Sequence, residues 1–107
     1  MEKYLCKITV MKKELYEDLQ REFLADPQLG KCQYFEEGQE FLVDRKECYR
    51  MMNGKFCSEA WDCIGKYVYL ILHGGEFYWT KEKNSVLVCC NDPTRPVIFK
   101  LERVVID

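Results

Sequence analysis

Seven cysteines stand among the 107 residues, and because their number is odd, a set of intrachain disulfides cannot use all of them. Residues 1–7 lack the apolar run and the small-residue cleavage site of a secretion signal. We therefore expect a cytoplasmic protein, whose thiols are kept reduced and whose fold rests on a hydrophobic core. In that compartment cysteines serve as packing residues, metal ligands or redox thiols. They are Cys6, Cys32, Cys48, Cys57, Cys63, Cys89 and Cys90.

The composition supplies the material for such a core. Hydrophobic residues make up 48% of the chain and aromatic residues 14%, which predicts one folded domain over residues 1–107. The net charge of −2 provides no field that would attract nucleic acid or anionic lipid. The longest apolar run, residues 67–72, is far shorter than the ~20 residues that cross a bilayer. We expect neither a nucleic-acid nor a membrane partner, and a homo-oligomer or a protein partner stays open.

The first third of the chain predicts a strand followed by a helix. Alternation of apolar and polar residues over 4–11 indicates a half-buried strand. Leu15, Leu19 and Phe23 then recur every fourth residue, which predicts a helix with this face buried and Gln20 on the outer face. Asp26-Pro27 ends that helix, because a residue before proline avoids the helical region. Residues 28–37 look irregular.

The remainder predicts a small α+β domain. Residues 39–43 form a short strand, residues 44–56 a polar segment with a turn, and a second helix begins at the N-cap Ser58 and stops at Gly74-Gly75. A strand over residues 67–72 is the alternative, because this run is apolar all round and partly β-branched. Residues 85–90 are apolar on both faces and predict an interior strand, and residues 97–105 predict a last strand. The order β-α-β-α-β-β indicates one mostly antiparallel sheet with two helices packed on it.

The cysteines differ in what their positions predict. Cys6 lies on the apolar face of the first strand and Cys63 borders the stripe of the second helix, so both are expected to pack in the core. Cys48 lies in a polar stretch and is expected to be exposed. Cys57 precedes the second helix, where backbone N–H groups favour a thiolate. Alternatively, Phe56-Cys57 forms a hydrophobic staple over Trp61.

Four positions form a candidate cluster: Cys32, Cys57, Cys89 and Cys90. Neighbouring strand residues point to opposite faces, so Cys89 and Cys90 reach one site only if the strand ends there. Zinc or an iron–sulfur centre is the cofactor that such thiols would hold, although the close pairs typical of zinc sites and the runs typical of ferredoxins are missing. The only histidine, His73, lies about 24 Å from Cys57 along the predicted helix. A Cys–His dyad is therefore not expected.

Three segments resemble a family of small uncharacterised cysteine-containing proteins found largely in anaerobic bacteria and archaea. They are residues 38–41 (GQEF), 56–61 (FCSEAW) and 89–103 (CCNDPTRPVIFKLER), the last being the most specific. The resemblance spans nearly the whole chain and implies that Cys32, Cys57, Trp61 and Cys90 occupy positions of the family pattern, with Cys89 as a common companion. It implies no catalytic residue. One departure is Asp92-Pro93, where the family usually shows Asp-Gly.

Two hypotheses of different classes follow. In the first, the cysteine cluster holds zinc or an iron–sulfur centre or works as redox thiols. In the second, the chain is a non-catalytic binding or interaction module with a pocket lined by Trp61, Tyr78, Trp79 and Arg95, and its cysteines are packing residues. A self-contained enzyme is the least favoured interpretation, because no acid–base pair is visible in the sequence.

Overall fold

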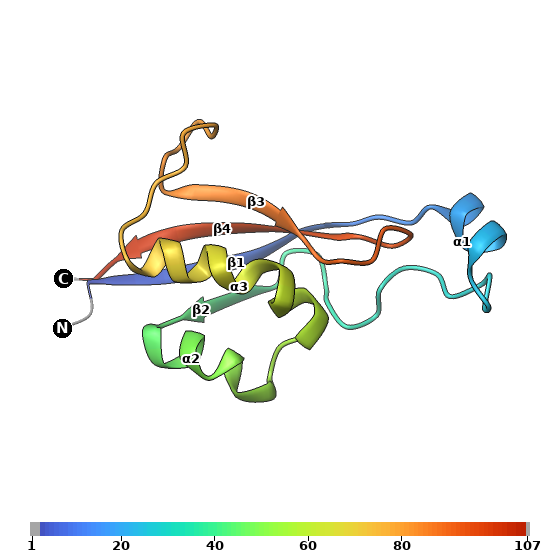
Figure 1. Ribbon diagram of the computed structural model, residues 1–107, viewed down its shortest axis with the longest axis horizontal. Coiled ribbons are helices and arrows are strands. Elements are labelled where there is room, and N and C mark those ends of the chain that lie inside the picture. The colour runs from blue at the N-terminus through green and yellow to red at the C-terminus, as the bar shows by residue number, and fades with distance from the viewer. Residues whose placement is uncertain (1–2, 107) are drawn as a thin grey trace.

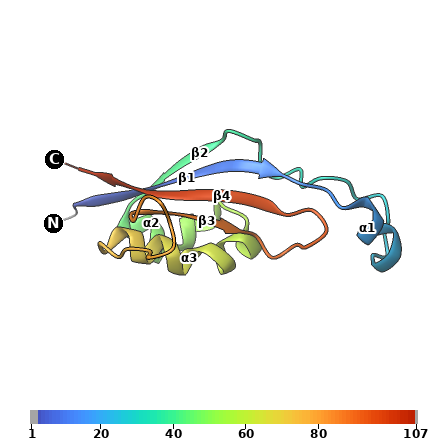
Figure 2. The same ribbon diagram turned by 90° about the horizontal axis from the view of Figure 1, so that it is seen from above.

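One antiparallel sheet of four strands, in the order β2-β1-β4-β3, forms the frame of the computed structural model, which describes residues 3–106. Helices α2 and α3 cover one face of this sheet, and α1 lies apart at the far end of the molecule (Figures 1 and 2). The elements are β1 (Tyr4–Lys13), α1 (Glu17–Phe23), β2 (Glu40–Val43), α2 (Arg45–Tyr49), the 3-10 helix η1 (Met51–Gly54), α3 (Ser58–Leu72), β3 (Ser85–Cys89) and β4 (Val97–Val105).

The predicted α+β class is confirmed, and the sheet is antiparallel throughout. β1 and β4 are the central strands, with a register shift in their pairing between Val10 and Lys12. The prediction of an interior strand at residues 85–90 is wrong, because β3 lies at the edge of the sheet. Its outward-facing residue Leu87 is 62% exposed. The apolar residues on the outer face of β3 are therefore at least partly exposed, and no second layer within residues 3–106 covers them.

The polar segment 44–56 holds more structure than the sequence predicted. The Asp44 side chain accepts a hydrogen bond from the backbone N–H of Glu47 at 2.7 Å, which caps the start of α2. One turn of helix then buries Cys48, so the expectation that this cysteine is exposed is wrong. η1 follows, with positive φ angles of 51° at Met51 and 60° at Met52.

The first helix is rotated relative to its prediction. α1 turns Gln20 inward, where only 1% of the residue is exposed, and leaves Phe23 70% exposed. The apolar repeat therefore does not mark the buried face of this short helix. The physical reason is that α1 lies beyond the end of the sheet and packs against polar loop backbone, which an amide side chain satisfies and a phenyl ring does not.

The core lies between the sheet and α3. Cys6, Ile8 and Val10 of β1 meet Ala60, Trp61, Ile64 and Val68 of α3, which confirms the predicted inner faces of both elements. Aromatic rings close the end of this core, with the rings of Phe35 and Phe99 centred 5.1 Å apart and those of Phe35 and Phe56 5.0 Å apart. No helix within residues 3–106 is both long enough and apolar enough to cross a membrane.

Candidate functional site

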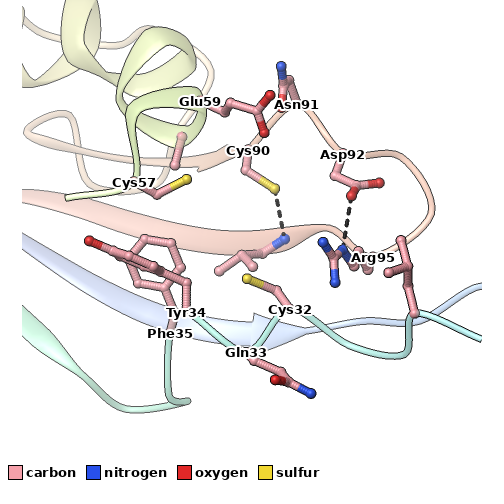
Figure 3. Close-up of a pocket in the computed structure, with 13 residues that line it drawn as sticks. Cys32, Gln33, Tyr34, Phe35, Cys57, Glu59, Cys90, Asn91, Asp92 and Arg95 are labelled. Carbon is pink, nitrogen blue, oxygen red and sulfur yellow. Dashed lines mark hydrogen bonds and ion pairs between the residues drawn. The ribbon is translucent and has the colours of Figure 1, made fainter.

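Three cysteines from distant parts of the chain line one pocket. Cys32 comes from the loop between α1 and β2, Cys57 from the start of α3, and Cys90 from the end of β3. The pocket has a volume of about 470 Å³, and the three sulfur atoms point into it (Figure 3). Its other lining residues are Leu29, Gln33, Tyr34, Phe35, Glu59, Ala60, Asn91, Asp92, Arg95 and Val97. We call this the thiol pocket.

Cys57 is placed by the first turn of α3. It is itself the N-cap residue, one position before the predicted cap Ser58, and its carbonyl accepts the first helical bond from the N–H of Trp61 at 2.9 Å. The rings of Phe56 and Trp61 lie 5.7 Å apart, edge to face. These residues occupy the two positions of a hydrophobic staple. The staple fixes how the chain enters the helix, and so presents the Cys57 thiol at the pocket.

Cys90 is held by two hydrogen bonds to Val97, just past the last residue pair of β3 and β4. Its N–H donates to the carbonyl of Val97 at 3.1 Å, and its sulfur accepts from the N–H of Val97 at 3.3 Å. The loop that follows is folded by Asp92, whose carboxylate accepts from the N–H and the hydroxyl of Thr94, each at 3.0 Å. Cys90 therefore lies one residue past β3 and is held in place by its hydrogen bonds to Val97 at the start of β4.

Cys32 depends on contacts that are remote in sequence. Two residues before it, Gly30 is hydrogen-bonded through both backbone groups to the side chain of Gln20. The same amide nitrogen of Gln20 donates to the Thr94 hydroxyl at 3.3 Å. Gln20 thus ties the Cys32 loop to the loop that follows Cys90, and these two loops form opposite walls of the pocket (Figure 3).

Charges of both signs meet at the pocket wall. The Nε of Arg95 lies 3.1 Å from the Asp92 carboxylate, so this cation is paired. Partial burial acts to raise the pKa of Asp92, but the hydrogen bonds from Thr94 and Arg95 outweigh it and hold the pKa below its usual range. Glu59 adds a second carboxylate at the rim.

Burial raises the pKa of the other four cysteine thiols. It raises the pKa of Cys6 to about 12 and that of Cys89 to about 11, in both cases with a neighbouring cysteine adding to the effect. Desolvation also raises the pKa of Cys48 and Cys63. A protonated thiol is a poor nucleophile, so thiolate chemistry at these four positions is disfavoured.

Cys89 lies outside the thiol pocket. It lines a separate hollow together with Cys63, Lys66 and Tyr67 of α3. All seven cysteines are free thiols. Within the part of the chain that the structure describes, no group of three or more His, Cys, Asp or Glu side chains is arranged to hold a metal ion. The assignment of Cys32, Cys57, Cys89 and Cys90 as metal ligands stays a prediction.

The four residues of the predicted binding pocket are not brought together. Arg95 lines the thiol pocket, while Trp61 packs on Phe56 and Trp79 borders a shallow hollow beside β3. Tyr78 is 87% exposed in the loop before β3. His73 ends α3 as predicted, where its ring stacks on Tyr69 at 4.1 Å.

Sequence reasoning missed two residues that organise the site, Gln20 and Asp92. The Asp-x-Thr spacing at Asp92 and Thr94 is a turn signal that pointed to one of them. The fold and the pocket define a small α+β protein with three thiols around one cavity. Comparisons with protein-family models, with curated proteins and with solved structures found no match. The resemblance to a family of small cysteine-containing proteins found largely in anaerobic bacteria and archaea stays a prediction.

Proposed function

We propose that this chain is a small cytoplasmic thiol protein that exchanges disulfides through Cys32, Cys57 and Cys90. The observation that carries the proposal is the convergence of these three side chains on one pocket from three separate segments. All three are partly exposed, whereas Cys6 and Cys48 are buried. The same three cysteines occupy positions of the pattern in the family that the sequence resembles.

The exchange has two steps. A thiolate of the pocket attacks one sulfur of a small-molecule disulfide, which forms a mixed disulfide and releases one thiolate. A second pocket thiolate then attacks the protein sulfur of that mixed disulfide, which closes a disulfide within the pocket and releases the second thiolate. Two protons leave the two cysteines and are taken up by the two released thiolates. Two electrons pass from the cysteines to the small molecule.

The pocket offers what such an exchange needs. Its volume of about 470 Å³ admits a small disulfide, and Glu59, with the part of the Arg95 guanidinium beyond the Nε that pairs with Asp92, provides contacts for the charged groups of a peptide-like thiol. The staple of Phe56 on Trp61 and the ladder bond at Cys90 hold two of the thiols in place. The Cys32 loop, tied through Gly30 to Gln20, supplies the third.

The test is oxidation of the reduced chain by glutathione disulfide, followed by alkylation and peptide mapping. We expect one intrachain disulfide between two of Cys32, Cys57 and Cys90, which is lost when either of the two cysteines that form it is replaced by serine. Cys63→Ser is the matched control, because Cys63 is also partly exposed but lies outside the pocket. A disulfide that involves Cys63 or Cys89, or scattered oxidation at all seven positions, would contradict the proposal.

Binding of zinc or an iron–sulfur centre by the same three thiols is the second candidate, and the presence of three converging thiols favours it. Tetrahedral thiolate ligation requires sulfurs about 3.5–4 Å apart, and among residues 3–106 no three ligands are arranged in this way, so the three thiols would have to draw together on metal binding. Anaerobic purification, elemental analysis and an absorption spectrum test this. Stoichiometric metal that is lost in Cys57→Ser supports it. A metal-free protein with unreactive thiols would instead favour the non-catalytic binding module.

A further inference from the structure

The outer edge of β3 carries backbone groups that the sheet does not use. The carbonyl of Asn84 accepts from Arg103 N and the N–H of Cys90 donates to Val97 O, both at 3.1 Å. Because residues of an antiparallel ladder alternate in facing their partner strand, Leu87 and Cys89 turn their N–H and C=O groups away from β4. These groups point to the side of β3 on which the sheet has no strand.

This edge lacks three of the features that protect exposed strands, namely charged residues, proline and a bulge. Proteins blunt an edge strand with charged residues, proline, a bulge or short length. β3 has the sequence Ser-Val-Leu-Val-Cys, without charge or proline, and it pairs with β4 in unbroken register. The opposite edge strand β2 is shorter and begins with Glu40. An uncharged edge with Leu87 standing 62% exposed is suited to pairing with another strand.

We propose that β3 pairs with β3 of a second copy of this chain, antiparallel about a twofold axis at Leu87, so that the two sheets become continuous. In this register the two Leu87 residues exchange N–H···O bonds. The N–H of Cys89 donates to the carbonyl of Ser85 of the second copy, and the reverse bond follows by symmetry. The N–H of Ser85 needs no partner there, because it already donates to Glu82 O at 3.2 Å.

Self-pairing fits the surroundings of the strand in shape, and the strand itself carries no charge. The start of β3 follows a loop that stands out beyond the edge (Figure 1) and carries Tyr78, 87% exposed, and Trp79, 59% exposed. The end of β3 borders a hollow of about 650 Å³ lined by Cys63, Tyr67 and Cys89, among others. An antiparallel pair brings the start of one strand beside the end of the other, so each aromatic loop lies next to the hollow of the second copy. No like charges face each other along the uncharged strands.

Sedimentation equilibrium of the full chain, with reductant present, tests the dimer. We expect the wild type to dimerise and Leu87→Lys to raise the dimer dissociation constant by about 100-fold or more, because two lysines would meet at the axis. Leu42→Lys is the matched control on the exposed face of β2 and should leave the dimer intact. A wild type that is monomeric at about 1 mM, or equal weakening by both variants, would overturn the proposal.

A cross-link reports the register independently of affinity. In Ser85→Cys the new thiol lies opposite Cys89 of the second copy, so mild oxidation should give a covalent dimer with this pairing in its peptide map. Lys100→Cys is the control, because it lies one strand further from the edge. A covalent dimer linked through other cysteines, or equal cross-linking of the control, would place the interface elsewhere.

Discussion

Gln20 holds Gly30 through both atoms of its side-chain amide. Its Nε2 donates to the Gly30 carbonyl at 3.2 Å, and its Oε1 accepts from the Gly30 N–H at 3.2 Å. The amide completes its bonds at the hydroxyl of Thr94. Gln20, which is 1% exposed, thus joins the loop at Gly30 to Thr94, a residue that lies 74 positions from Gln20 in the sequence. The geometry of the thiol pocket rests on this contact.

Gln20→Ala should loosen the Cys32 wall of the pocket. The variant leaves both backbone groups of Gly30 without a partner, which costs about 1–3 kcal/mol of the free energy of unfolding. Local opening should also speed alkylation of Cys32 more than alkylation of Cys57, as measured by timed labelling and mass spectrometry. Gln28→Ala, at an exposed position in the same loop, is the control. Equal acceleration at both cysteines would mean general unfolding and no positioning role for Gln20.

The elements that the sequence predicted well are those with long local patterns. The stripe of α3 and the alternation of β1 each repeat several times, so their buried faces follow from the residues alone. α2 has only five residues, too few for a periodic pattern, and was missed. Cys32 lines the same pocket as Cys57 because Gln20 bonds to Gly30, and no local sequence pattern encodes that contact. Whether β3 is an edge or an interior strand depends likewise on which strands lie beside it.

The left-handed backbone of η1 predicts that substitutions at Met51 and Gly54 change the free energy of unfolding in opposite directions. Met51 has a φ of 51° and is largely exposed, so Met51→Gly should relieve backbone strain and stabilise the fold by about 1 kcal/mol. Gly54 has a φ of 77° with open space around it, so Gly54→Ala should destabilise the fold by a similar amount. Urea denaturation of both variants checks the pair. If both changes destabilise, loss of Met51 contacts outweighs the strain.

Arg103 ties the end of α3 to the sheet. Its Nε donates to the carbonyl of Ile71 at 2.7 Å, a second nitrogen donates to the carbonyl of Gly75, and its guanidinium lies 4.9 Å from the ring centre of Tyr4. Arg103→Ala leaves the carbonyl of Ile71 in the last turn of α3 and the carbonyl of Gly75 in the following loop without this partner, and should lower the free energy of unfolding by about 2–3 kcal/mol. Arg21→Ala, at an exposed position of α1, should change it by less than about 0.5 kcal/mol. Thermal denaturation of both variants measures the difference, and equal effects would contradict a tethering role.

Cys6 makes the stability of the fold depend on alkaline pH. Burial in the core, with Cys48 nearby, raises the pKa of its thiol from 9.0 to about 12. The unfolded chain therefore loses this proton near pH 9, while the folded chain keeps it until about pH 12. The stabilisation is fully present below pH 9 and is lost between these two values, with a slope approaching about 1.4 kcal/mol per pH unit from this one group.

Cys6→Ala separates this effect from the titration of other groups. The variant is expected to be less stable than the wild type at pH 7, because it leaves a small cavity beside Ile8 and Val43. Between pH 9 and 10.5 its free energy of unfolding should fall less steeply than that of the wild type, so the two curves converge as pH rises. Urea denaturation at a series of pH values measures both curves. Parallel curves would show that Cys6 titrates alike in the folded and unfolded chains, and that burial does not protect its proton.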